Sequence, residues 1–192
     1  MFQPTAPSDE RIRRFLASQR DLLFSYPEVG ASRAVPPAGY NVDHNRIRLG
    51  AGPETFKRAV AALRRWEMFS IGWVRLCWPT TPLAVGAIFG VVIKHVGFWS
   101  LNSARIVYVI EEDGPIQRYG FAYGTLPGHA ERGEERFTVE WRHDDDTVWY
   151  DLFAFSRPRH ALVWAGYPLA RLLQRRFASD SKAAMARAVD VR

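Results

Sequence analysis

The chain has 192 residues, of which 47% are hydrophobic and 14% aromatic. A chain of this length can bury about two-thirds of the surface that its unfolded form exposes, so we expect one domain with a single core. The net charge of +6 would allow weak attraction to phosphates. The basic residues are nearly all arginine and are spread among acids, so we expect no nucleic-acid partner.

The single cysteine excludes an intramolecular disulfide and a cysteine metal cage. Cys77 lies in the apolar run WVRLCWP, where a buried, inert thiol is expected, and a chain without disulfides suits a reducing compartment. The first thirty residues hold no long apolar segment, so no secretory signal peptide is expected. The longest apolar run, 82–93, is well short of the roughly 20 residues that cross a bilayer. We therefore expect a cytoplasmic protein with no transmembrane segment.

The first 65 residues predict two helices separated by a loop and a strand. Ser8 has the chemistry of a helix N-cap, and apolar residues then recur at near-helical spacing up to Pro27. Proline and glycine predict a surface loop over 25–40, and 40–50 has the pattern of a strand. Pro53 then opens a second helix, because its missing N–H costs nothing in the first helical turn.

A series of strands follows from Gly72, rich in aromatic and β-branched residues. The expected strands are 72–78, 86–98, 100–111, 116–126, 134–143 and 146–156. Asp and Gly at 111–116 and Asp at 143–147 predict tight hairpin turns, so the sheet is expected to be antiparallel. After residue 160 the helical period returns, and Pro168 is expected to mark the start or a kink of a long C-terminal helix.

These elements predict an α+β fold in which the last helix covers the apolar face of the sheet. We divide the chain into an N-terminal helix and surface loop, 1–39, and one domain, 40–192. The order of elements over 40–190 resembles the helix-grip fold of the birch-pollen-allergen, lipid-transfer (START) and polyketide-cyclase superfamily. That resemblance implies a curved antiparallel sheet of about seven strands that wraps around the C-terminal helix and leaves a cavity between them.

Five sequence segments carry a more specific resemblance. They are VDHNRIRLG (42–50), LNSARIVYVI (101–110), YGFAYGTLPGHAERGEERF (119–137), WYDLFAFSRP (149–158) and RRFASDSKAAM (175–185). Their wording and order resemble the signature segments of an uncharacterised protein family, number 0548, found in bacteria and plants. The resemblance spans nearly the whole chain. It implies the helix-grip fold and carries no activity or substrate.

The stretch YGTLPGHAERGEERF (123–137) has the composition of an active site and also that of a hairpin loop. Alternation in the strand places Glu135 on the apolar face, at the end of a row of apolar residues. The opposite face, which is expected to meet solvent, carries Glu134, Arg136, Thr138 and Glu140. Partial burial would raise the pKa of Glu135 and make it a usable acid or base, or the side chain simply reaches water. His129 is either oriented by nearby glutamates for proton transfer or solvated.

Asp151 shares a strand face with Trp149 and Phe153. A lone carboxylate among aromatic rings needs a partner, and Arg105 on a neighbouring strand is the expected one. The pair would serve either as a structural ion pair or as a ligand anchor.

The aromatic residues of the predicted strands suggest a pocket. Sites for small molecules are mostly apolar with a few convergent polar groups, and a sheet curved around a helix can form one. The expected ligand-binding residues are Arg105, Tyr123, Trp141, Trp149 and Phe153. The expected partner is a small hydrophobic or aromatic molecule, or a lipid.

The sequence lacks the common spacings of metal, nucleotide and serine-hydrolase motifs, so we expect no metal and no cofactor. Three functions remain. A ligand-binding module is favoured. The alternative is a cyclase- or hydrolase-type enzyme with His129, Glu135 or Asp151 as general acid and base. The last is association with anionic lipid or nucleic acid through the basic residues of the final helix, which are Arg171, Arg175, Arg176 and Lys182.

Overall fold

The computed structural model describes residues 2–78, 80–159 and 167–190, and it contains one antiparallel sheet packed against helices. The strands are β1 (Phe2–Gln3), β2 (Asn41–Ala51), β3 (Val74–Cys77), β4 (Ile88–Lys94), β5 (Trp99–Glu112), β6 (Ile116–Thr125), β7 (Glu131–Arg142) and β8 (Thr147–Pro158). The helices are α1 (Asp9–Ser18), α2 (Gly52–Arg64) and α4 (Tyr167–Val189), with 3₁₀ turns η1 (Ala31–Arg33) and η2 (Glu67–Phe69).

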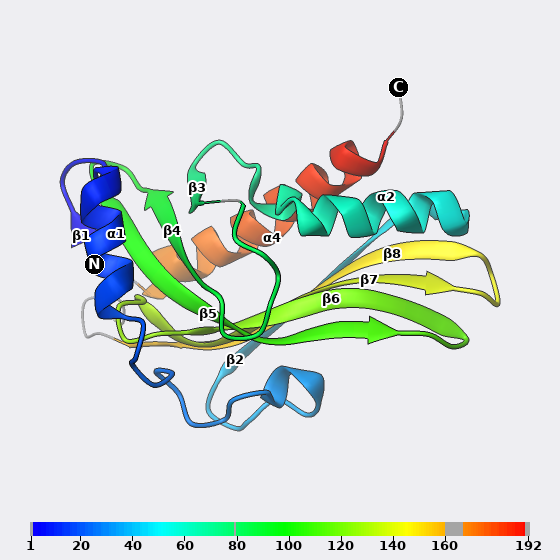
Figure 1. Ribbon diagram of the computed structural model, residues 1–192, viewed down its shortest axis with the longest axis horizontal. Coiled ribbons are helices and arrows are strands. Elements are labelled where there is room, and N and C mark those ends of the chain that lie inside the picture. Colours follow the sequence, from blue (N-terminus) through cyan, green and yellow to red (C-terminus); the bar gives the residue numbers. More distant parts are fainter. Residues whose placement is uncertain (1, 79, 160–166, 191–192) are drawn as a thin grey trace.

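Seven strands form the sheet in the order β2-β8-β7-β6-β5-β4-β3, and the short β1 pairs with β5 beside this path. Every pairing is antiparallel, as the short turns predicted. α2 and α4 lie on one side of the curved sheet (Figure 1). The expected α+β, helix-grip arrangement is therefore confirmed.

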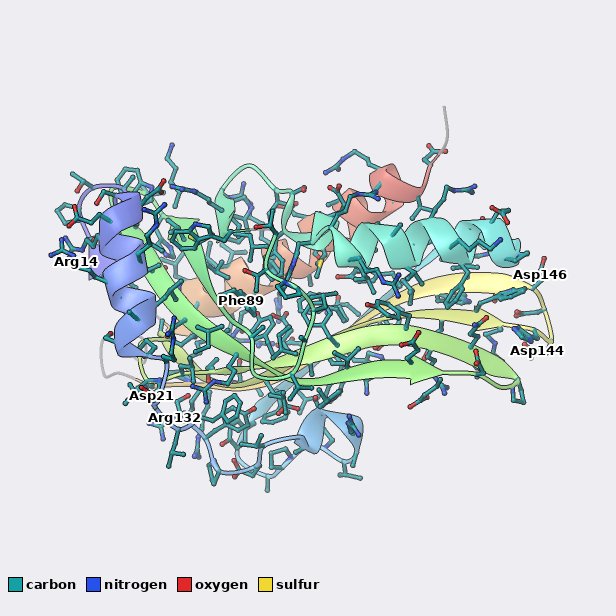
Figure 2. All side chains as sticks on the ribbon, in the orientation of Figure 1. Arg14, Asp21, Phe89, Arg132, Asp144 and Asp146 are labelled. Carbon is teal, nitrogen blue, oxygen red and sulfur yellow. The ribbon has the colours of Figure 1, made fainter. Side chains whose placement is uncertain are left out.

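The concave face and its two helices enclose the main core. Its largest fully buried side chains include Trp66, Phe89, Phe121, Phe137 and Tyr150. Figure 2 shows Phe89 in the interior of the molecule. The C-terminal half of α4 is tied to the sheet by a hydrogen bond of 2.8 Å between the hydroxyls of Tyr150 and Ser181.

The first helix is shorter than its apolar spacing predicted. Ser8 caps α1 as expected, because its Oγ accepts a hydrogen bond from the Arg11 N–H. The helix ends at Ser18, because the next residue, Gln19, is buried and its side-chain oxygen accepts a 2.7 Å hydrogen bond from the backbone N–H of Gly128. Leu23 is 85% exposed and does not continue the apolar stripe. A tertiary contact therefore overrides the helical period.

The convex face of the sheet is not a solvent face, contrary to the sequence-based expectation. α1 packs Ile12 against the β3–β5 end of the sheet, and residues 24–40 cover β7 and β8. In Figure 1 residues 24–40 lie on the side of the sheet opposite α2 and α4, and α1 stands at one end of the molecule beside β4. Gly124 is required beneath it, because a Cβ at that position would collide with the Tyr26 hydroxyl and the Phe24 ring.

Glu134 anchors this covering segment. Its carboxylate is only 2% exposed and accepts hydrogen bonds from the Tyr26 hydroxyl at 2.6 Å, the Gly30 N–H at 2.7 Å and the Ser32 N–H at 3.0 Å. The Ser32 hydroxyl donates a fourth. A buried carboxylate is tolerated when its lone pairs are satisfied in this way. Glu134 thus holds residues 26–32 against the sheet rather than meeting water.

Within the residues that the structure describes, no helix combines the length and the apolar character needed to cross a membrane. The free thiol of Cys77 is buried, as its apolar surroundings predicted. Burial raises the pKa of this thiol to about 11, so it stays protonated and unreactive at neutral pH.

Candidate functional site

A pocket with a volume of about 500 Å³ lies between the concave face of the sheet and the first turns of α4. Inward-facing residues of β2, β6, β7 and β8 form its floor, and Leu169, Leu173 and Phe177 of α4 form its roof. Further aromatic side chains complete the walls: Phe69, Trp73, Phe98 and Tyr123. The wall is thus largely apolar, with a few polar groups set into it.

Tyr123 and Glu135 meet in this pocket. They are direct partners on neighbouring strands β6 and β7, and the Tyr123 hydroxyl donates a hydrogen bond to the Glu135 carboxylate. Burial raises the pKa of Glu135 to about 7. Burial and the adjacent carboxylate also raise the pKa of Tyr123. Near neutral pH, Glu135 can therefore both accept and release a proton.

His129 lies in the β6–β7 hairpin and also lines the pocket. Its Nδ1 contacts the backbone of Glu131, lying 3.1 Å from the N–H and 3.2 Å from the carbonyl oxygen. Burial lowers the pKa of His129 to about 4, so the ring is neutral at physiological pH. The hairpin is held against β5, where the Ala130 N–H donates to the Asn102 side chain at 3.2 Å. YGTLPGHAERGEERF is thus a hairpin and, at the same time, a wall of the pocket.

A second polar group joins α4 to the sheet at the pocket. Arg171 holds both carboxylate oxygens of Asp43, at 2.5 and 2.7 Å. Gln174 donates to Glu131 at 2.6 and 2.7 Å and to the Ser156 hydroxyl at 3.0 Å. Burial raises the pKa of Glu131. These contacts fix the position of the first half of α4 above the sheet.

Asp151 lies outside this pocket, on the convex face of the sheet. Its carboxylate contacts His44 Nε2 at 2.6 Å, Arg46 Nε at 3.1 Å and Arg136 Nη2 at 3.2 Å. The expected partner, Arg105, instead donates to the backbone oxygens of the α1–β2 segment. Arg105 is too far along the sheet, because it pairs in register with β4 and β6 while Asp151 lies between β2 and β7.

The three remaining aromatic candidates also lie outside the pocket. Trp149 packs under the Arg46 guanidinium on the convex face, and Phe153 belongs to the cluster beneath residues 24–40. Trp141 donates a 2.8 Å hydrogen bond to Asp146 near the tip of the β7–β8 hairpin. Figure 2 shows Asp146 at the end of the molecule opposite Arg14 of α1. Of the eight sequence candidates, Tyr123, His129 and Glu135 line the pocket.

Several pocket residues were not singled out from the sequence. They are Asp43, Glu131 and Gln174 among the polar ones, and Phe69, Trp73 and Phe177 among the aromatic ones. Strand alternation puts Asp43 on the face opposite His44, and this is the sequence signal that could have found Asp43. Gln174 had no signal, because a polar residue at the edge of an amphipathic helix normally faces water.

The basic residues of α4 are mostly engaged within the protein. Arg171 pairs with Asp43, Arg176 stacks on Trp73 at 5.0 Å, and the Lys182 ammonium lies 3.4 Å from the Asn45 side-chain oxygen. Across the described part of the chain, no three His, Cys, Asp or Glu side chains gather in a geometry that would hold a metal ion.

Comparison with known proteins identifies the family. A family model described as Domain of unknown function (DUF1990) matches residues 25–184. A UPF0548 protein of Dictyostelium discoideum is 38% identical over 208 residues, which cover 98% of this chain and 96% of that protein. A UPF0548 protein of Arabidopsis thaliana is 35% identical over 156 residues, covering 79% and 75%.

Among solved structures, a hypothetical protein from Helicobacter pylori superposes with a TM-score of 0.51 at 17% identity, over 85% of this chain and 96% of that one. At this identity the likeness concerns the fold alone. The sequence relatives confirm the resemblance that the five segments predicted, and the chain belongs to the DUF1990 family, whose members are named UPF0548 proteins.

Proposed function

We propose that this protein binds a small hydrophobic or aromatic molecule, or a lipid, in the pocket between the concave face of the sheet and α4. The observation that carries the proposal is the pocket itself. Its volume of about 500 Å³ falls in the usual range for ligand sites, and its aromatic and aliphatic wall holds a few polar groups. Since a water molecule occupies about 30 Å³, the pocket suits an organic molecule of roughly 15–25 non-hydrogen atoms.

The uneven burial of α4 supports this proposal. Its C-terminal half is in the core, where Ala184 and Met185 are fully buried. At its start, Leu169 and Leu172 are 55% and 62% exposed, and Leu169 lines the pocket. The first half of the helix thus contributes apolar surface that the protein itself does not bury. A ligand beneath it would bury part of that surface.

The test is binding of N-phenyl-1-naphthylamine, a neutral apolar dye whose fluorescence rises in apolar surroundings. Ala154→Trp places a large ring in the pocket from β8, and Ala17→Trp places the same ring on the exposed side of α1. We expect saturable binding that Ala154→Trp weakens at least about tenfold and Ala17→Trp leaves unchanged. Equal binding by both folded variants would exclude the pocket as the site.

Acid–base catalysis is the second candidate, and the Tyr123–Glu135 pair favours it. A carboxyl group whose pKa is raised to about 7, in contact with bound ligand, is suited to moving a proton. The ligand extracted from the protein would be incubated with it in D₂O. If the unmodified protein exchanges deuterium into carbon positions of the ligand and Glu135→Gln does not, catalysis is supported. If neither protein causes exchange, the protein binds the ligand without acting on it.

We place this function in the cytoplasm. The single cysteine, Cys77, is buried and free, and a domain that needs no disulfide suits a reducing compartment. Fractionation of the host cell with an antibody to the protein tests this placement.

A further inference from the structure

The pocket differs in charge from the rest of the chain. The whole sequence carries 26 Lys and Arg against 20 Asp and Glu. Among the described residues that line the pocket there are four acidic ones, Asp43, Glu131, Glu134 and Glu135, and no lysine or arginine. Three of them, Asp43, Glu131 and Glu135, carry their carboxylates on the concave side, whereas the Glu134 carboxylate turns to the convex side. Although the protein is basic overall, the described wall of the pocket carries acidic residues and no lysine or arginine.

The four acidic residues differ in the partners of their carboxylates. Asp43 is paired with Arg171, and Glu134 directs its oxygens to the donors of the convex side. Glu131 accepts hydrogen bonds from Gln174, which is uncharged. Glu135 has one hydrogen bond from the described residues, that of the Tyr123 hydroxyl, and this donor is also uncharged. The charge on Glu135 thus has no cationic partner in the described part of the protein.

The surroundings of Glu135 destabilise its ionised form. Burial raises its pKa to about 7, and the nearby carboxylates of Glu131 and Asp43 act in the same direction. An ionised carboxylate in an apolar pocket is costly unless a cation pairs with it. A ligand that carries a positive charge would supply the missing partner.

We propose that the ligand is an organic cation, a protonated amine on an aromatic or aliphatic body, whose ammonium group binds the Glu135 carboxylate. This inference rests on the proposed function, since it specifies the class of molecule that the pocket takes. It excludes fatty acids and other carboxylic acids and phosphates as the main ligand, because such anions would meet Glu131 and Glu135 without a compensating cation.

The aromatic wall favours the same class. Phe69, Trp73, Phe98, Tyr123 and Phe177 all line the pocket. Aromatic faces attract ammonium groups, and the attraction is stronger where water is excluded. The rings would therefore hold the apolar body of the ligand and stabilise its charged end as well.

The proposal makes binding depend on pH in a defined way. The titratable groups around Glu135 are Tyr123 on β6, Glu131 on β7, Tyr150 on β8, Asp43 on β2 with its Arg171 partner on α4, and His129 in the hairpin. The two tyrosines stay protonated over the range tested, because burial raises the pKa of each. His129 stays neutral above pH 5, because burial lowers its pKa to about 4. Glu135 is the group that ionises near pH 7.

The experiment compares three probes with one apolar body: 1-naphthylmethylamine, 1-naphthylmethanol and 1-naphthoic acid. Affinities are measured by calorimetry at pH 8 and pH 5.5, where the amine stays protonated. At pH 8 we expect the amine to bind at least about tenfold more tightly than the alcohol, and the acid most weakly. At pH 5.5 about 3% of Glu135 is ionised if its pKa is 7, so amine affinity should fall toward that of the alcohol, by at most about 30-fold.

Two variants assign the effect to Glu135. Glu135→Gln should remove the preference for the amine and its pH dependence, while alcohol binding persists and reports an intact pocket. Glu54→Gln makes the same charge change on an exposed residue of α2 and should alter nothing. Tyr123→Phe removes the hydrogen bond that favours the ionised form of Glu135, so the midpoint of the pH dependence should move above 7.

The outcomes separate the two proposals. Amine selectivity that disappears in Glu135→Gln supports the cationic ligand. Alcohol binding equal to amine binding, with both blocked by Ala154→Trp, overturns the cationic ligand and leaves the proposed function standing. If Ala154→Trp leaves the affinity for all three probes unchanged, the pocket is not the binding site. The proposed function then fails, and the cationic ligand fails with it.

Discussion

Glu134 and Glu135 are adjacent in the chain but lie on opposite faces of β7, and they differ in how many hydrogen bonds their carboxylates accept. Glu134 faces the convex side and accepts four hydrogen bonds from Tyr26, Gly30 and Ser32. Glu135 faces the pocket and accepts one, from Tyr123. The first carboxylate completes the fold, whereas the second has capacity left for a ligand.

The same contrast holds for the two faces of the sheet. On the convex side the N-terminal segment covers the strands, and Asp151 is met by His44, Arg46 and Arg136. On the concave side a pocket of about 500 Å³ separates the sheet from α4. Buried charge that is fully paired indicates structure, and buried charge beside a pocket without a paired cation indicates a site.

Glu134→Ala should have the largest effect on stability. It leaves buried donors of Tyr26, Gly30 and Ser32 without their acceptor, so we expect a loss of about 3–5 kcal/mol in the free energy of unfolding. Urea unfolding measures it. Glu112→Ala, at the exposed end of β5, is the control and should cost under about 0.5 kcal/mol. A similar small loss in both would contradict the anchoring role of Glu134.

Asp151→Asn should cost about 2 kcal/mol, because Arg46 and Arg136 lose a buried ionic partner. It should leave the affinity for 1-naphthylmethylamine unchanged, because Asp151 lies on the convex face. The two readouts are urea unfolding and calorimetric titration of the same sample. If the folded variant binds the amine more weakly, Asp151 contributes to ligand binding and its assignment to a structural role is wrong.

Glu135→Gln should raise the free energy of unfolding, whereas the two substitutions above lower it. The carboxyl ionises near pH 4.5 when unfolded and near 7 when folded, so its stabilising protonated form is fully present below pH 4.5 and lost as the pH rises through 7. At pH 8 the variant should gain on the order of 1–3 kcal/mol over the parent, and at pH 4 almost nothing. Urea unfolding across this range measures the gain, and a loss of stability at pH 8 would contradict this account.

His129→Gln should give the smallest effect, seen only in acid. The ring titrates near pH 6.5 when unfolded and near 4 when folded, so the stability that it contributes is lost as the pH falls from 6.5 to 4. The variant should lose less stability than the parent over this interval, by on the order of 1 kcal/mol. Thermal unfolding of both proteins measures this from pH 7 to 4. If the unfolding temperatures of the two proteins fall by the same amount over this range, the burial of the ring is contradicted.

The strands and the faces of β7 were predictable from the sequence, because side-chain alternation depends only on local geometry. Alternation also grouped Trp149, Asp151 and Phe153 correctly, but it does not tell which face meets the helix. The aromatic rows on the convex side suggested an interior, and they are buried by residues 24–40 instead. That loop has no periodicity, and its contact with Glu134 spans about a hundred residues, so no local signal predicts it.

The most direct test of the central claim is native mass spectrometry of the protein purified from its own host, followed by denaturing extraction of whatever it carries. We predict one bound small molecule per chain, apolar or aromatic in its body and basic in its charged group. A stoichiometric carboxylic acid or phosphate ester would contradict the account, because no cation in the described pocket wall is placed to receive it.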